Sequence, residues 1–181
     1  EIQPGEGNVH FDTEKKTFVD GGATANDVTI QSEVYGIRID HEYVTKAIAN
    51  DLNAISAVTG KSVWYSPVSN YIHLYDTTIE SVDEAIANLP MDGLEIDLRG
   101  TNTLTTLEET PLYIGAQTII TGDEDEGGVL SVYSDDGNGI VMAADLNMKD
   151  CTVGAESGYG SAIKGVNGTE KLSLDFATVE A

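Results

Sequence analysis

Acidic residues cluster in two glycine-containing stretches of the sequence, "GDEDEGG" at 122–128 and "SDDGNG" at 134–139. Calcium ions in proteins are usually held by six to eight oxygens, which come from carboxylates and accessible backbone carbonyls. The two stretches therefore predict either a calcium site or a pair of exposed acidic loops. The carboxylates that would bind the ion are Asp123, Asp125, Glu126, Asp135 and Asp136.

Two tyrosines close to these stretches could form a different kind of site. Tyr133 follows the apolar residue Val132 in an alternating segment and is expected to point outward, and Tyr159 lies in the glycine-containing corner "SGYGS". An exposed aromatic ring offers a rigid apolar surface with a polar tip, which suits the apolar face of a sugar ring. The two tyrosines therefore predict a carbohydrate-binding platform, unless they are ordinary surface residues.

The same region contains residues of a type found in catalytic sites. Paired carboxylates such as Asp135 and Asp136 are the type of group that hydrolyses glycosidic bonds. The histidines of the chain lie far from this pair in sequence, at His10, His41 and His73. Adjacent aspartates at a turn commonly accept hydrogen bonds from the local backbone. We therefore expect a turn, no catalytic residues and a protein that is not an enzyme.

The overall charge restricts the classes of partner. The 181 residues include 31 Asp and Glu against 9 Lys and Arg, which gives a formal net charge of −22. Binding to nucleic acid depends on Lys and Arg that neutralise phosphates, so we expect no nucleic-acid partner. No apolar run is long enough to cross a bilayer, so we expect no membrane insertion. Cys151 is the single cysteine and is expected to be a small buried hydrophobe.

An internal repeat indicates the elements that would carry these residues. The segment "LNMKDCTV" at 146–153 returns as "LSLDFATV" at 172–179, an offset of 26 residues (172 minus 146). Apolar residues alternate within each copy, as they do in a strand that buries one face. Self-similarity at such a period, built from strands, predicts a solenoid.

Earlier segments follow the same pattern. Two alternating strands flank a glycine-containing turn in "GLEIDLRGTNTLTT" at 93–106 and in "QTIITGDEDEGGVLSVYS" at 117–134. A third short strand is expected at 112–114, 139–142 and 162–165. One coil cannot bury its apolar face alone, so several coils must stack. The sequence therefore predicts a mainly β protein, a parallel β-helix of about four short coils.

The first part of the chain does not follow the repeat. Alternating patterns predict a hairpin at 9–19, one or two strands at 27–40 and two strands at 61–76. Apolar residues three or four positions apart predict helices at 41–60 and 77–90. We therefore expect residues 1–76 to form an N-terminal α+β cap or small domain. Residues 77–181 are expected to form a capping helix plus the parallel β-helix.

Two stretches resemble a known superfamily. The segment "TIESVDEAIANLPMDGLEIDLRG" is similar to the cap helix and first strand of the right-handed parallel β-helix (pectate-lyase-like) superfamily. The repeats from "GVLSVYSDDGNGI" to "EKLSLDFATVEA" resemble those of secreted bacterial carbohydrate-binding and adhesin-like β-helix proteins. The resemblance covers about residues 77–181 and implies a right-handed coil.

The resemblance also implies a function. It implies a non-catalytic carbohydrate-binding or adhesion module, secreted or at the bacterial cell surface, whose partner is a polysaccharide or a host or cell-surface glycan. One alternative is a calcium-dependent polysaccharide lyase or hydrolase of the same fold. However, the "GHG" and "RIK" elements that accompany paired aspartates in polygalacturonases are absent from this sequence. The other alternative is a structural spacer in a larger surface protein.

Overall fold

The computed structural model describes residues 9–12, 17–20, 23–24, 33–89, 91–123 and 127–181. The chain divides into two compact units, Glu1–Glu33 and Val34–Ala181. In the first unit, three strands form an antiparallel sheet, namely β1 (Val9–Asp12), β2 (Thr17–Asp20) and β3 (Ala23–Thr24). The hairpin predicted at 9–19 is therefore confirmed.

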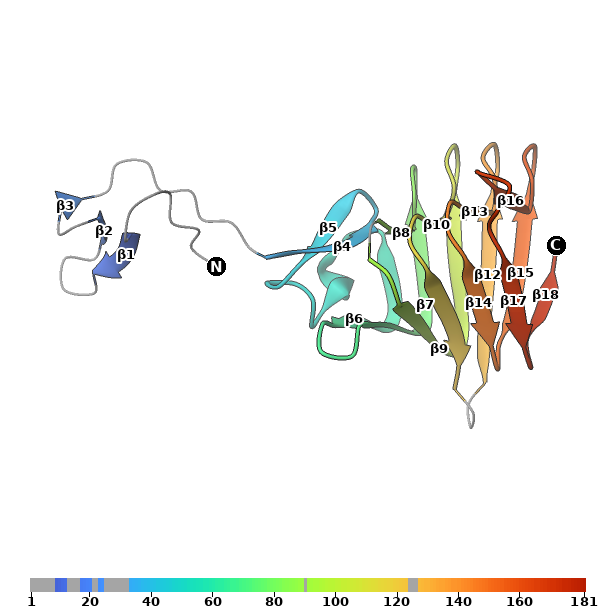
Figure 1. Cartoon of the computed structure of the whole chain (residues 1–181), viewed down its shortest axis with the longest axis horizontal. Helices are drawn as coiled ribbons and strands as arrows, with labels where there is room; N and C mark the ends of the chain where they lie inside the picture. Colours follow the sequence, from blue (N-terminus) through green and yellow to red (C-terminus); the bar gives the residue numbers. More distant parts are fainter. Residues whose placement is uncertain (1–8, 13–16, 21–22, 25–32, 90, 124–126) are drawn as a thin grey trace. The chain divides into compact units, whose positions relative to one another are not determined.

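The second unit is a stack of coils, and equivalent strands of successive coils are paired in parallel (Figure 1). The first two coils contain β7 (Tyr71–Ser81) with β8 (Ile86–Asn88), and β9 (Leu94–Thr106) with β10 (Leu112–Ile114). The third contains β11 (Thr118–Gly122), β12 (Gly128–Ser134) and β13 (Ile140–Met142). The fourth contains β14 (Leu146–Lys149), β15 (Thr152–Ser157) and β16 (Ile163–Gly165). Another coil begins with β17 (Leu172–Asp175) and β18 (Thr178–Glu180).

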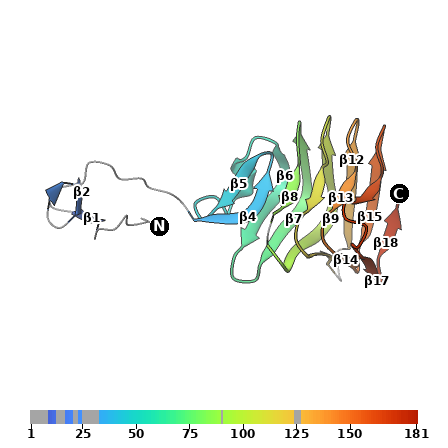
Figure 2. The ribbon, with the colours of Figure 1, turned by 45° about the horizontal axis from the view of Figure 1, so that its top comes forward.

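Each coil therefore has three sides, and Figure 2 shows the coils stacked one after another along the unit. The long strand β9 bends and supplies two of them, because its first half pairs with β11 and its second half pairs with β12. The third side is the sheet of β8, β10, β13 and β16. The short strands predicted at 112–114, 139–142 and 162–165 are those of this third side, and they are confirmed.

Equivalent apolar residues of successive coils form columns inside the stack. In one column, Ile72, Ile96, Ile120 and Met148 are paired in register, and each is at most 1% exposed. The sequence repeat has the same origin, since residues 146–149 pair with residues 172–175 at the offset of 26. The fold is a parallel β-solenoid of about four turns, and the predicted mainly β class is confirmed.

Four further elements precede the first coil, namely β4 (Val34–Ile39), β5 (Glu42–Thr45), the 3₁₀ turn η1 (Leu52–Ala54) and β6 (Val58–Ser66). Strand β4 pairs antiparallel with β8, and β6 pairs antiparallel with β7. The two strands predicted at 61–76 thus belong to β6 and β7. In the described part of the chain no helix is long and apolar enough to cross a membrane.

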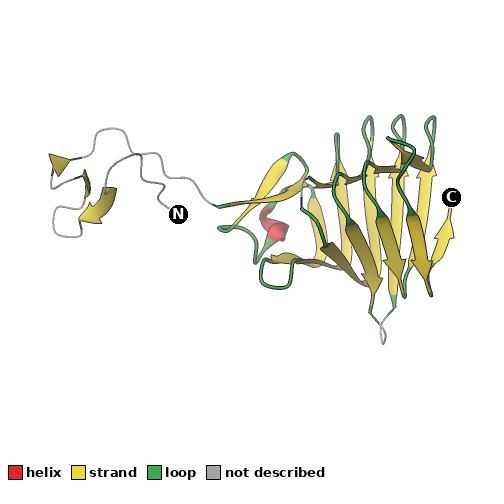
Figure 3. Cartoon of the chain, viewed as in Figure 1, coloured by secondary structure: helices red, strands yellow, loops and turns green. Residues whose placement is uncertain are grey.

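The helix predicted at 41–60 is wrong, and Figure 3 shows one short helical turn there among strands. Its apolar residues do reach the core, because Val44, Leu52, Ile55 and Val58 are all at most 5% exposed. They reach it from a strand, a turn and another strand. Pairing of β5 with β4 and of β6 with β7 supplies backbone hydrogen bonds that a helix would otherwise have to make itself.

The capping helix predicted at 77–90 is also wrong. Residues 77–81 complete β7, and Ile86–Asn88 form β8. The apolar spacing of three and four residues arises because the chain turns a corner between these strands. Val82 lies outside the corner and is 56% exposed, whereas Ala85 and Ile86 are fully buried. Parallel pairing with β9 and β10 is a long-range interaction that local periodicity does not reveal.

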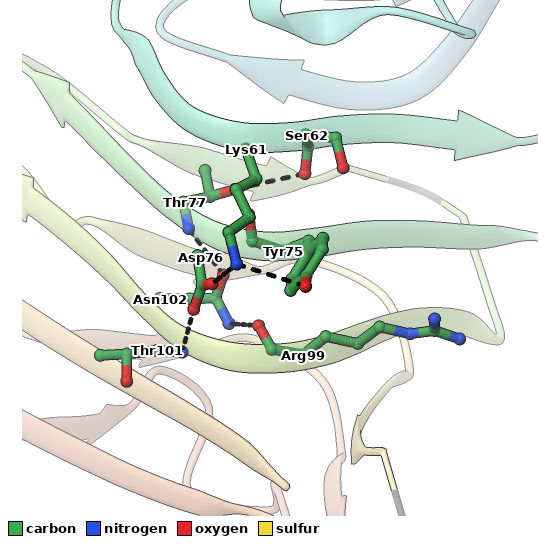
Figure 4. A network of polar contacts seen from close by, with 8 residues as sticks. All are labelled: Lys61, Ser62, Tyr75, Asp76, Thr77, Arg99, Thr101 and Asn102. Atoms are coloured by element: carbon green, nitrogen blue, oxygen red, sulfur yellow. Dashed lines mark hydrogen bonds and ion pairs between the residues drawn. The ribbon is translucent and has the colours of Figure 1, made fainter. Parts of the chain in front are cut away.

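A buried amide fixes the first corner of the coil (Figure 4). The side chain of Asn102 is fully buried, and its Oδ1 accepts a hydrogen bond of 3.0 Å from the backbone N–H of Thr77. Its Nδ2 donates to the carbonyls of Arg99 and Val129, at 3.2 and 3.3 Å. One side chain therefore connects three successive coils at the bend.

Outside the same corner, charged groups join two of these coils. Lys61 Nζ lies 2.6 Å from an oxygen of Asp76 and 3.3 Å from the hydroxyl of Tyr75. The other oxygen of Asp76 accepts a bond of 3.0 Å from the backbone N–H of Thr101. Asp76 has a positive φ of 42°, and Gly100, its neighbour in the next coil, has a φ of 64°. A left-handed residue thus turns the chain at this corner in both coils.

Candidate functional site

The second corner of each coil is closed by a hydroxyl group. A Ser or Thr ends the second side of each coil, at positions that pair in register, Ser81, Thr106, Ser134 and Ser157, of which the first three are buried and Ser157 is partly buried. The hydroxyl of Ser134, for example, accepts a bond of 2.9 Å from the backbone N–H of Gly137 and donates one of 2.8 Å to the carbonyl of Glu109. These bonds fix the path of the backbone where the chain leaves the strand.

Two outward columns of side chains flank this inward column of hydroxyls. Successive strand residues point to opposite faces, so the residues before and after each hydroxyl both point outward. The residues before it form the column Glu80, Thr105 and Tyr133, in the register of β7, β9 and β12. The residues after it form the second column, Val82, Leu107 and Asp135.

The two columns enclose a groove of about 430 Å³. Its apolar surface comes from Val82 and Leu107, each 56% exposed, and from the ring of Tyr133, which is 38% exposed. Strands in a sheet are about 4.8 Å apart, so three coils give the groove a length of roughly 10 Å. The groove therefore combines an accessible aromatic ring with two aliphatic side chains and a carboxylate at each end, Glu80 and Asp135.

A hydrogen bond orients the aromatic ring. The hydroxyl of Tyr133 donates to Oδ1 of Asp135 at 2.5 Å. This bond raises the pKa of the Tyr133 hydroxyl above its usual value, and the nearby charges of Asp135, Glu156 and Asp136 act in the same direction. The phenol consequently stays protonated over the whole neutral range, with its ring fixed across the groove.

Of the two tyrosines expected to form a platform, one lies in this groove. Tyr159 lies beyond the end of β15, is 87% exposed, and is not among the residues that line the groove. The two tyrosines therefore do not form one platform. The ring of Tyr133 is held by Asp135, whereas the ring of Tyr159 extends into solvent. The sequence prediction did not include Glu80 and Val82, because it assigned both to a helix.

The residues expected to bind calcium lie at the two ends of one strand. Asp123 precedes β12, and Asp135 and Asp136 follow it. A strand of seven residues spans about 20 Å, so the two groups are too far apart to surround one ion. Asp125 and Glu126 lie outside the described residues. Among the residues that are described, no group of three His, Cys, Asp or Glu side chains is placed to hold a metal ion.

A second polar cluster lies on the outer face of the first side of the coil. His73 Nδ1 lies 2.6 Å from Oδ2 of Asp97, and the ring of His73 stacks on Trp64 with 4.4 Å between ring centres. Arg99 Nε lies 3.4 Å from Asp123 and 3.9 Å from Asp97. Trp64 is partly exposed on this outer face, whereas the next residue, Tyr65, is 3% exposed.

Cys151 is buried as predicted, at 5% exposure. Burial raises the pKa of its thiol. A buried thiol with a raised pKa is a poor nucleophile, because the reactive form is the thiolate. The residue therefore acts as part of the apolar interior.

The structure is thus a parallel β-solenoid with a surface groove across its second corner. The chain matches no protein-family model, no curated protein and no solved structure. What is shown of the expected resemblance is therefore the parallel β-solenoid fold itself.

Proposed function

We propose that the protein is a non-catalytic carbohydrate-binding or adhesion module, secreted or at the cell surface, that binds a glycan in the Tyr133 groove. The observation that carries the proposal is the position of Tyr133. Its ring is partly exposed, fixed by the bond to Asp135, and bordered by aliphatic side chains. Ligand sites typically combine such an apolar lining with a few well-placed polar groups.

Each part of the groove would contact a different part of a sugar. The ring of Tyr133 and the side chain of Leu107 offer apolar surface to the C–H face of a pyranose. The carboxylates of Glu80 and Asp135 accept hydrogen bonds from hydroxyl groups, and charged acceptors form stronger bonds than neutral ones. The hydroxyl of Thr105, between them, both donates and accepts.

The proposal is tested by screening the wild-type protein on a glycan array and measuring the best ligand by calorimetry. Tyr133→Ala is expected to weaken binding at least tenfold, because it removes the aromatic surface of the groove. Tyr159→Ala is the matched control, since it removes an exposed tyrosine outside the groove. Binding that is unchanged in Tyr133→Ala, or lost equally in both variants, would refute the groove as the site.

Calcium is retained as a separate hypothesis for each end of β12. The pair Asp135 and Asp136 is the better end to test, because Asp135 also lines the groove. A calcium ion held there would provide a bridge to a negatively charged polysaccharide. Calorimetric titration of CaCl₂ into the wild type and into Asp136→Asn tests this hypothesis. Heats that are identical in the two proteins would remove Asp136 as a ligand.

The same preparation distinguishes the alternative functions. A polysaccharide lyase or hydrolase would release unsaturated or reducing ends from polysaccharides that bind to the array. A structural spacer would neither bind glycans nor release products. The proposed module predicts saturable binding without product formation.

A further inference from the structure

The groove carries negative charge, which a neutral sugar does not require for binding. Among the eight residues that line it, all within the described part of the chain, two are carboxylates and none is Lys or Arg. The carboxylates lie diagonally across the groove, with Glu80 on the first coil and Asp135 on the third. A ligand that spans the coils would meet a negative charge at each end.

Residues outside the lining strengthen this negative field. Glu156 pairs with Tyr133 on the next coil, and Asp136 directly follows Asp135. The hydrogen bond to Asp135 is the main cause of the raised pKa of Tyr133, and the negative charges of Asp135, Glu156 and Asp136 act in the same direction. His41 Nε2 lies 2.5 Å from Oδ2 of Asp83, the residue that follows Val82 in the chain.

We propose that the groove selects glycans that carry free amino groups, such as oligosaccharides of glucosamine, over neutral or uronic-acid glycans. This inference rests on the proposed carbohydrate-binding function. An ammonium group beside a carboxylate forms charge-assisted hydrogen bonds that an acetamide does not form. The face of the Tyr133 ring also attracts a cation. Uronic acids would instead meet two like charges.

The experiment compares three ligands of the same length, each a tetrasaccharide. The wild-type protein is titrated with a β-1,4-linked glucosamine tetrasaccharide, with its fully N-acetylated counterpart and with a galacturonate tetrasaccharide. Each exposed carboxylate–ammonium pair should contribute about three- to fivefold in affinity. We expect the amino ligand to bind at least tenfold more tightly than the acetylated one, and the galacturonate to bind most weakly.

Variants of the groove identify which carboxylates cause the preference for the amino ligand. Glu80→Gln and Asp135→Asn should each reduce the preference for the amino ligand by about three- to fivefold. In both variants the affinity for the amino ligand should fall by more than the affinity for the acetylated ligand. Glu42→Gln removes an exposed carboxylate on β5 that is not among the residues lining the groove, and is the matched control. Raising the ionic strength from about 0.1 M to about 1 M should remove most of the preference.

The possible outcomes separate this inference from the proposed function. Equal affinity for the amino and acetylated ligands would overturn the selectivity and leave carbohydrate binding intact. A preference that persists in both groove variants would overturn the assignment to Glu80 and Asp135. Failure of all glycans to bind would overturn the proposed function and the inference together.

Discussion

The buried amide of Asn102 should be essential for the stability of the first corner. We consider the substitution Asn102→Leu, which keeps the size of the side chain and matches Leu130, its paired neighbour on the next coil. In most inward positions of a solenoid, leucine would be the better residue. Here it would leave the hydrogen-bonding groups of three coils without partners.

The expected loss of stability in Asn102→Leu follows from the three hydrogen bonds that the substitution removes. The N–H of Thr77 lies in a residue that is 1% exposed, and a buried donor without a partner costs about 1–3 kcal/mol. The two carbonyls that accept from Nδ2 each lose a bond with a net value of about 1 kcal/mol. Apolar burial of leucine offsets about 1 kcal/mol of this loss. The expected net destabilisation is therefore about 3 kcal/mol.

Urea unfolding followed by circular dichroism measures this effect. With a slope of about 2 kcal/mol per molar urea, a loss of 3 kcal/mol lowers the midpoint by about 1.5 M. Thr103→Val is the control, because Thr103 is the outward neighbour on the same strand and its substitution should change stability by less than about 0.5 kcal/mol. A midpoint for Asn102→Leu within about 0.3 M of the wild type would show that the reasoning is wrong.

Three further predictions concern other positions. Phe176 has a positive φ of 50° and is 91% exposed, and Asn adopts this conformation more easily than Phe, so Phe176→Asn should stabilise the last coil by about 0.5–1 kcal/mol. The measurement is slower amide hydrogen exchange in β17 and β18, and unchanged exchange would contradict the prediction. Cys151 should react with a thiol reagent at least 100-fold more slowly in the native protein than in urea, and rapid native reaction would show that the coil opens. The hydrogen bond from Lys61 lowers the pKa of Asp76 in the folded protein. The Asp76 carboxylate therefore stabilises the fold at pH values above its unfolded pKa. This stabilisation is lost as the pH falls through its folded pKa. The difference in urea midpoint between the wild type and Asp76→Asn should therefore be larger near pH 7 than near pH 2, and a difference that does not vary with pH would contradict the assignment.

The last coil exposes the apolar residues that every earlier coil buries. Leu172 and Leu174 continue the inward columns of Leu146 and Met148, yet they are 38% and 51% exposed. Strands at the edge of a sheet also carry unpaired backbone groups, which favour association with other strands. This end of the unit is consequently the part of the described surface where the stacking interactions of the solenoid are unsatisfied.

The sequence by itself determined the solenoid, because the alternation of apolar residues that specifies this fold is repeated along the chain. Alternation of apolar residues selects strands, and the recurrence of Leu146 and Met148 as Leu172 and Leu174 sets which strands stack. The burial of Cys151 and the outward direction of Tyr133 follow from the same alternation. These features depend on local pattern, which a single sequence contains.

Only the tertiary structure decided the first coil and the groove. The apolar spacing at 41–60 and 77–90 fits a helix as well as a chain that turns corners, and pairing with distant strands selects the corners. The groove joins Glu80, Leu107 and Tyr133, which are separated by about a coil each and become neighbours through the register of β7, β9 and β12. Register between strands is a long-range property, since it is fixed by how the columns inside the coil pack.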